Sequence, residues 1–343
     1  MANNLKLAQV FRDNLVLRQN KPIRIFGKGF GNVTARLEKD DGSDLQYRTV
    51  KADEKGSWLI TLDARTYGGP YTLTVTCGNE STEIHNVMIG EVILFSGQSN
   101  IQFHMSCEVT PQSEYVRDPM LRIFVSERLE KEELFTPADG WIGAVPEQIV
   151  GWSALAYLVG LEHRRAYPDI AVGVVACSQG ASCIQSWIDE TLFTGDDEAL
   201  SFHQNPVEFY KLWNDPGRLY RYMLEPLMPM PISYVVWYQG ECNTRPNEAE
   251  NYGRMLELLT SCWRKGFMDD ELRFCIVQLA DHQKAGWPPL WKLVQQIQAD
   301  APSHIPHTVS VKCADICEDD NIHPPTKWKL AKRIFEAMNR PEN

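Results

Sequence analysis

The sequence lacks a long hydrophobic run. Although 43% of its 343 residues are hydrophobic, no stretch approaches the ~20 consecutive apolar residues that a membrane-spanning helix requires. The opening residues, MANNLKLAQVF, also lack the basic segment and the following apolar segment of a secretory signal. We therefore expect a soluble, cytoplasmic protein with no membrane partner. A secreted or periplasmic protein is the alternative if a signal peptide has been removed.

The sequence also lacks an excess of positive charge. It has 34 Lys and Arg against 45 Asp and Glu, which gives a formal net charge of -11. Nucleic acids and anionic membranes bind clustered Lys and Arg, so this balance argues against either as the main partner. The composition is otherwise that of a globular protein without repeats or low-complexity segments, and it carries no information on the oligomeric state.

Paired cysteines and cofactor motifs are absent as well. The nine cysteines, an odd number, are scattered singly, which predicts free thiols in a reducing compartment. No G-x-G-x-x-G or P-loop pattern is present, so no nucleotide cofactor is expected. Cys313 and Cys317 with His323 suggest zinc, but a second Cys or His pair is missing, and we expect no metal.

The first feature that is present is a series of short alternating runs between residue 6 and about residue 88. Turn-forming segments such as GFGN, KDDGSD and TYGGP separate the runs. This pattern predicts an N-terminal β-sandwich, which we assign to residues 1–88 as an accessory domain. The runs are NLVLRQ, IRIFGKG, VTARLEK, SWLITL and YTLTVTC.

From Gly90 the runs become continuously apolar, and helical patterns separate them. Strands that are apolar on both faces predict a mostly parallel sheet with helices on both sides. Residues 89–343 are therefore expected to form a three-layer α/β domain. In such sheets, functional residues collect at the carboxyl ends of the strands. The runs are EVILF, IAVGVVAC, SYVVWY and RFCIVQLA.

Small and polar residues follow three of these runs. The first ends in SGQSN, where Gly97 permits a sharp bend and Ser99 is presented at the strand tip. The second leads into a loop of small residues that contains Gly180, and the third is followed by Gln239 within YQGECN. These loops hold one candidate nucleophile and several hydrogen-bond donors.

An acid–histidine pair near the C-terminus completes a set for acyl transfer. A serine hydroxyl becomes nucleophilic when a neighbouring base takes its proton, and His323 suits this role. Asp320, three residues earlier, is expected to orient the imidazole, with the adjacent Asp319 as the open alternative. The oxyanion needs donors, which we assign to the N–H groups of Ser99 and Gly180 and to an amide side chain of the third loop.

Each of these signals is weak when it is taken alone. A lone Gly-x-Ser is common, DNIH is also typical of a turn or a helix cap, and Gly180 also suits close packing of a helix on a strand. The combination is stronger because the segments fall in order at the predicted strand ends of one sheet.

The motifs around these residues resemble those of the sialate O-acetylesterases, which are carbohydrate esterases of the SGNH (GDSL-like) hydrolase superfamily. GEVILFSGQSN resembles their nucleophile block, QGASCIQSW their small-residue loop, YQGECN their third block and DNIHP their D-x-x-H block. In the N-terminal part, FRDNLVLRQNKPIRIFGKG, ADEKGSWLITL and GGPYTLTV are also similar to the family. The likeness covers nearly the whole chain.

The resemblance implies a flavodoxin-like SGNH hydrolase domain fused to a β-sandwich. It implies removal of acetyl groups from sugar hydroxyls without a metal or another cofactor, with an acetylated carbohydrate as the partner. It also implies Ser99 as the nucleophile, His323 as the base and Asp320 as the partner of His323.

The resemblance implies further residues for the oxyanion and the sugar. Gly180 is joined by an amide of the third block, either Gln239, which lies nearest the strand end, or Asn243. Sialic acid carries a carboxylate, which a guanidinium binds in a bidentate manner, so Arg245 is a candidate partner for it; an exposed arginine at the start of a helix is the alternative interpretation. The expected substrate-binding residues are Gln98, Asn100, Glu241, Asn243 and Arg245. Nearby aromatic residues, which either stack on a sugar or fill the core, are Trp187, Trp237 and Tyr238.

Three departures from the family pattern bear on the sugar pocket and leave the triad intact. Gln179-Gly180-Ala181-Ser182 stands where the family usually has Trp-Gly-Gly-Thr, Gln185 replaces a Glu, and Ile101 replaces a Met. We expect a serine esterase that removes O-acetyl groups from sialic acid or a related carbohydrate through an acetyl-enzyme intermediate. An acetyl-xylan or other glycan acetylesterase is the alternative within the class, and a non-catalytic carbohydrate-binding protein is the alternative outside it.

Overall fold

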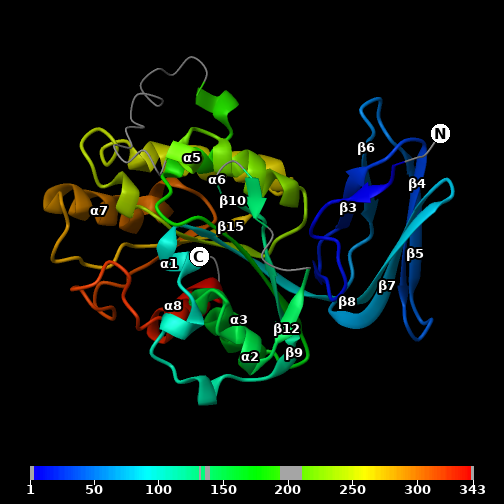
Figure 1. The fold of residues 1–343 in the computed structure, drawn as a ribbon, viewed down its shortest axis with the longest axis horizontal. Helices are drawn as coiled ribbons and strands as arrows, with labels where there is room; N and C mark the ends of the chain where they lie inside the picture. Colours follow the sequence, from blue (N-terminus) through cyan, green and yellow to red (C-terminus); the bar gives the residue numbers. More distant parts are fainter. Residues whose placement is uncertain (1–3, 131–132, 136–139, 194–210, 341–343) are drawn as a thin grey trace.

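The computed structural model describes residues 4–130, 133–135, 140–193 and 211–340, and it has an α/β fold built on one large mixed sheet (Figure 1). Within these residues the sheet has 11 strands. The strands of the first part of the chain are β1 (Lys6–Leu7), β2 (Val16–Arg18), β3 (Ile23–Lys28), β4 (Asn32–Lys39), β5 (Leu45–Lys51), β6 (Ser57–Leu62), β7 (Gly68–Cys77) and β8 (Glu80–Gly97). The later strands are β9 (Asp118–Val125), β10 (Arg128–Glu130), β11 (Glu133–Phe135), β12 (Ile142–Ala144), β13 (Ala171–Ser178), β14 (Tyr234–Tyr238), β15 (Arg273–Val277) and β16 (Thr308–Val311).

The part of the sheet that carries the candidate site is parallel. Its order is β12-β9-β13-β8-β14-β15-β16, and every neighbouring pair from β9 to β16 runs parallel. At the edge, β12 pairs antiparallel with β9. The three strands at the centre are β13, β8 and β14, and they contain three of the apolar runs from which strands were predicted.

The N-terminal strands continue this sheet. β8 is 18 residues long and crosses the expected boundary between residues 88 and 89. Its first part pairs antiparallel with β7, which pairs with β4, and β4 pairs with β5. A separate three-stranded sheet has the order β1-β3-β6. The expected separate β-sandwich and mostly parallel sheet are therefore not confirmed: the sheet is mixed, because one long strand belongs to both parts.

Helices lie on both faces of the parallel part of the sheet (Figure 1). α3 packs against α8 and against β13, and α6 packs against α7. Two of the helices expected between the apolar runs are present, as α3 before the second run and α6 before the fourth. The helices are α1 (Ser99–Gln102), α2 (Pro146–Ile149), α3 (Ala154–Ala166), α5 (Lys211–Asn214), α6 (Tyr252–Phe267), α7 (Pro288–His304) and α8 (Trp328–Met338).

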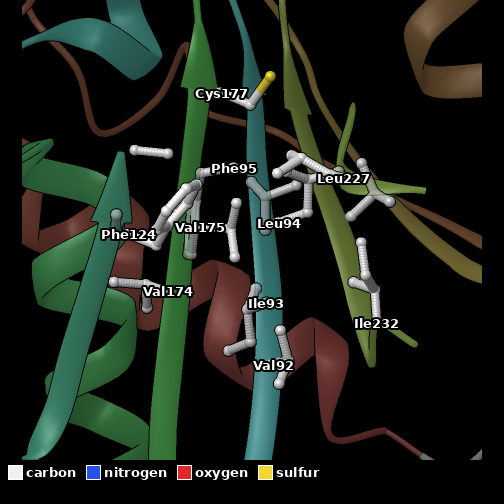
Figure 2. Close-up of a cluster of buried hydrophobic side chains, with 14 of the residues drawn as sticks. Val92, Ile93, Leu94, Phe95, Phe124, Val174, Val175, Cys177, Leu227 and Ile232 are labelled. Atoms are coloured by element: carbon white, nitrogen blue, oxygen red, sulfur yellow. The ribbon is translucent and has the colours of Figure 1, made fainter. Parts of the chain in front are cut away.

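The central strands are buried on both faces. All residues of β13 are buried, as are Val92 to Phe95 of β8. Figure 2 shows side chains of these strands packed with Phe124 from β9 and with Leu227 and Ile232. Burial of apolar side chains on both sides of a strand removes them from water, and each large one contributes about 1.5–3 kcal/mol to stability. This core fixes the strands whose ends carry the candidate site.

The three central strands end side by side. In the register of the sheet, Gly97 lies opposite Ser178 on one side and opposite Tyr238 on the other. Two further backbone hydrogen bonds extend this alignment, since Gln98 N–H donates to the Tyr238 carbonyl and Gln179 N–H donates to the Gly97 carbonyl, both at 3.1 Å. The loops that follow the three strands therefore begin at the same level, at the carboxyl edge of the sheet.

The nine cysteines are all free thiols. Among the described residues, no group of three or more His, Cys, Asp or Glu is arranged to hold a metal ion. Cys313, one of the residues considered above for zinc, donates its thiol hydrogen to the Gln278 carbonyl at 2.9 Å. No helix in the described ranges is long and apolar enough to cross a membrane.

Gly97 is predicted to be essential for this alignment. Its φ is +135°, and a Cβ at this position would lie 2.1 Å from the Tyr238 carbonyl oxygen. Gly97→Ala should therefore lower the free energy of unfolding by about 2–4 kcal/mol, as measured by urea denaturation. The control is Gly143→Ala, where the nearest atom would lie at 3.7 Å. Equal stability of the two variants would contradict the prediction.

Candidate active site

Ser99 and His323 are in hydrogen-bond contact although they are far apart in the sequence. The Ser99 Oγ and His323 Nε2 atoms are 2.8 Å apart. Ser99 is the first residue of the short helix α1, directly after the turn at Gly97. His323 comes from the loop between β16 and α8. The contact has the distance that proton transfer from a hydroxyl to an imidazole requires.

The loop that carries His323 is held through its backbone. The Asn321 Oδ1 accepts the His323 N–H at 2.9 Å, which is the turn geometry that Asn favours. Asp320 is exposed, and among the described residues its carboxylate makes no hydrogen bond or ion pair with His323. The side chain of the neighbouring Asp319 accepts from Gln283 Nε2 at 2.9 Å. Neither candidate acid contacts the imidazole in this structure.

The surroundings of His323 favour its neutral form. Burial lowers the pKa of His323 below its ordinary value, and the positive charge of Lys327 and the nearby His282 lower it further. A neutral imidazole is the form that can accept a proton from Ser99. His323 is therefore unprotonated over more of the mildly acidic range than an exposed histidine.

The small-residue loop after β13 comes close to Ser99. A Cβ at Gly180 would lie 3.8 Å from the Ser99 Cβ. The Gly180 N–H donates to the side-chain carbonyl of Gln102 at 2.8 Å. Ala181 follows with a φ of 54°, in the left-handed region, which costs a residue with a Cβ roughly 1–2 kcal/mol. The sequence did not predict the contact with Gln102, because no motif marks it.

The two candidate amides of the third loop are buried in a hydrogen-bond network. Gln239 Nε2 donates to the Ser182 carbonyl at 2.9 Å and to the Asn243 Oδ1 at 2.7 Å. Asn243 Nδ2 donates to Gln185 Oε1 at 3.0 Å and to Glu248 Oε2 at 3.1 Å. Each amide thus directs its hydrogens to protein acceptors, and the network joins the third loop to the loop after β13.

Three of the expected substrate-binding residues also have protein partners. The Gln98 Oε1 accepts from the N–H groups of Gly240 and Cys242, both at 3.4 Å. Asn100 Nδ2 donates to Glu241 Oε1 at 2.6 Å. Gln98 and Asn100 are buried, with exposed fractions of 3% and 1%. Their polar groups connect the loops of the site to one another.

Arg245 is half-buried at the end of the third loop, and its carbonyl accepts from the N–H of Glu248 at 3.2 Å. A second guanidinium, that of Arg128, lines a cavity of about 120 Å³ next to the site. Gln102, which contacts Gly180, and His104 line the same cavity. Two arginines therefore lie on segments that border the candidate site.

The aromatic residues near the motifs belong to the core. Trp187, Trp237 and Tyr238 each have an exposed fraction of 0%. The rings of Trp187 and Trp237 are 6.1 Å apart in an edge-to-face arrangement, and Trp237 packs in the same way on Trp263 at 5.5 Å. Of the two readings of these residues, core filling is the one that their burial supports.

A serine and a neutral histidine in contact at the carboxyl edge of a parallel sheet, with N–H donors beside them, form an arrangement suited to acyl transfer. This chemistry defines the class of protein as a hydrolase or transferase of acyl groups. The comparisons with known proteins narrow it to a family.

A family described as carbohydrate esterase, sialic acid-specific acetylesterase, matches residues 90–340. The chain belongs to this family, and it is a carboxylic ester hydrolase. The chain is 26% identical to the sialate O-acetylesterase of Rattus norvegicus over 390 residues, which cover 94% of this chain and 71% of the relative. It is also 26% identical to the sialate O-acetylesterase of Homo sapiens, over 96% of this chain and 69% of the relative.

A solved structure is similar over nearly the whole chain. The crystal structure of a carbohydrate acetylesterase from Xanthomonas citri has a TM-score of 0.81 and 27% sequence identity. The match covers 97% of this chain and 74% of that one. The arrangement of both parts of the chain, including the N-terminal strands, therefore recurs in another member of the esterase class.

Gln239 is predicted to stabilise the site through its buried amide. In addition to its two donated bonds, its Oε1 accepts from the Tyr252 hydroxyl at 2.9 Å. Gln239→Met keeps the length of the side chain but leaves several buried groups without a partner, so unfolding should require about 2–4 kcal/mol less free energy. Tyr252→Phe, which removes a single hydroxyl, should cost about 1 kcal/mol. Thermal and urea denaturation would measure the stability of both variants. A Gln239→Met protein as stable as the unmodified protein would contradict the stabilising role of this network.

Proposed function

We propose that this protein removes O-acetyl groups from sialic acid or a related acetylated carbohydrate, with Ser99 as the nucleophile. The observation that carries the proposal is the 2.8 Å contact between Ser99 Oγ and His323 Nε2. It lies within the segment that matches the sialic acid-specific acetylesterase family. The relatives named for their action on sialate esters support the choice of substrate.

The reaction has two stages. Ser99 Oγ attacks the acetyl carbonyl carbon while its proton passes to His323 Nε2. His323 then gives this proton to the oxygen of the departing sugar hydroxyl, which leaves an acetyl group on Ser99. Water attacks the acetyl-enzyme, again with His323 as the base, and acetate and the free serine are released.

The oxyanion of each tetrahedral intermediate needs donors near Ser99. The N–H groups of Ser99 and Gly180 are the proposed donors, and an amide of the third loop, Gln239 or Asn243, is the proposed third. Since both hydrogens of either amide are bonded to protein acceptors, that amide would release one of its acceptors when the oxyanion forms. Because the Gly180 N–H is bonded to Gln102 Oε1, Gln102 would release it when the oxyanion forms. The loss of one such donor typically reduces kcat by about 10²–10³-fold.

Asp320 is the proposed partner of His323. Its support is the position three residues before His323 on the same exposed loop. A rotation of its side chain toward Nδ1 on substrate binding would place a carboxylate where the imidazolium charge develops. Asp319, whose carboxylate is bonded to Gln283, is the alternative acid.

For the fold, we assign residues 89–343 to a flavodoxin-like SGNH hydrolase domain and residues 1–88 to an accessory part. The parallel order of β9, β13, β8, β14 and β15 supports the first assignment. Since β8 runs through both parts, the N-terminal strands would support the strand that leads to Ser99.

The proposed function predicts that Ser99→Ala abolishes esterase activity. Acetate release from p-nitrophenyl acetate and from 9-O-acetyl sialic acid should fall by about 10³-fold or more, because the variant removes the hydroxyl that is hydrogen-bonded to His323. Ser106→Ala, at an exposed serine, is the matched control. Activity that survives Ser99→Ala would end the proposal. Release from neutral acetylated xylan alone would select the glycan acetylesterase, and binding without turnover would select the carbohydrate-binding protein.

Arg245 is predicted to determine the preference for a substrate with a carboxylate. Arg245→Gln should lower kcat/KM for 9-O-acetyl sialic acid about 10–100-fold, because the variant loses a charge-assisted hydrogen bond to the carboxylate. The kcat/KM for p-nitrophenyl acetate, which has no carboxylate, should not change. Arg128→Gln tests the guanidinium of the 120 Å³ cavity in the same way, and Arg340→Gln is the exposed control. A constant ratio between the two substrates in the Arg245 variant would refute its role, and a change only in the Arg128 variant would move the carboxylate to that cavity.

A further inference from the structure

A lysine is completely buried between the loops of the candidate site. Lys327 has an exposed fraction of 0%, although lysine is almost never fully buried unless it is paired. Its Nζ donates to the Asn100 Oδ1 at 2.6 Å. The same ammonium group lies 5.0 Å from the centre of the Phe103 ring and 5.6 Å from that of Tyr238, distances at which an aromatic face attracts a cation.

Asn100 links Lys327 to the segment that carries Ser99 and to the segment that carries His323. Its Nδ2 donates to the Ile322 carbonyl at 3.0 Å and to the Glu241 Oε1 at 2.6 Å. Asn100 is adjacent to Ser99 in the chain, and Ile322 is adjacent to His323. One fully occupied amide therefore joins the segment of the nucleophile to the segment of the base.

We propose that Lys327 is a positioning residue that, through Asn100, holds the backbone of the His323 loop at the distance from which His323 reaches Ser99. This inference rests on the proposed function, and it adds a residue that acts through others. Lys327 makes no contact with the reacting atoms. It fixes the orientation of the Asn100 amide, because an ammonium group can only donate and so requires the amide oxygen.

Two observations explain why the loop depends on this contact. The first is that His323 has no hydrogen bond to an acid in the described part of the chain, so its position is set by its backbone. The second is that Lys327 directly precedes α8, at the N-terminal cap position of the helix. A shift of Lys327 would therefore move the start of α8 and the loop that precedes it. The buried Glu108 reinforces this point, since its Oε1 accepts the Lys327 N–H at 3.0 Å.

The charge of Lys327 has a second effect on the same pair. The groups that face its ammonium are Cys313, Cys317, Glu241 and Glu318, yet burial outweighs their influence and lowers the pKa of Lys327 to about 8. The lysine is thus charged below that pH. In this state it lowers the pKa of His323, together with burial and His282. A positioning residue that carries this charge therefore also extends the pH range over which His323 is neutral.

The test compares Lys327→Met with Asn100→Ser, and uses Lys329→Met, at an exposed lysine of the same helix, as the matched control. Both site variants should lower kcat by about 10–100-fold with little effect on KM for p-nitrophenyl acetate, because they misplace the base and leave the binding of the ester intact. Only Lys327→Met should also move the acid limb of the kcat/KM profile to higher pH, since it removes the positive charge near His323. Asn100→Ser keeps that charge below pH 7.

The NMR titration of the His323 ring in the same proteins gives a readout that does not require turnover. A rise in the His323 pKa in Lys327→Met, with no rise in Lys329→Met, supports the inference. An acid limb and a ring titration that do not move, with an activity loss equal to the loss of folded protein, overturn it. If Lys327→Met does not fold, a normal kcat in Asn100→Ser overturns it. If the unmodified protein releases no acetate from any ester, the proposed function fails, and the ring titration alone still decides whether Lys327 acts on His323.

Discussion

The alignment of three strand ends at one edge of the sheet is the constraint on which the rest of the site depends. Gly97, Ser178 and Tyr238 are neighbours in the register of β8, β13 and β14. A parallel sheet holds this alignment only while its strands remain buried on both faces, as the core around Val92 to Phe95 shows (Figure 2). Ser99, Gly180 and Gln239 follow these strand ends. They are far apart in the sequence, and the alignment of the strands places their loops next to one another.

The buried polar groups around the site are hydrogen-bonded to other groups of the protein. The amides of Gln98, Asn100, Gln239 and Asn243 are buried and each has a protein partner. In a poorly solvated interior, such partners favour the observed arrangement of the loops, because each buried group left unpaired would cost about 1–3 kcal/mol. Ser99 and His323, which are both half-buried, lie beside this network.

Much of the site could be predicted from the sequence, because it rests on local signals. Continuous apolar runs marked the second part of β8 and β13, and the small residues after them marked the loops with Ser99 and Gly180. The arrangement of the N-terminal strands was not predictable, since the alternation that marks β7 and β8 as strands does not reveal that β8 continues into the parallel part of the same sheet. Lys327 and Gln102 were missed because their significance comes from burial and from contacts over long sequence distances.

The central claim is that Ser99 carries the acetyl group during the reaction. The most direct measurement mixes the protein with p-nitrophenyl acetate, quenches the reaction with acid within milliseconds to seconds, and locates the acetyl group by mass spectrometry of the digested protein. The account predicts one acetyl group on the peptide that contains Ser99, which disappears as acetate is released. An acetyl group found on a cysteine or a lysine, or rapid acetate release with no acetylated peptide, would contradict it.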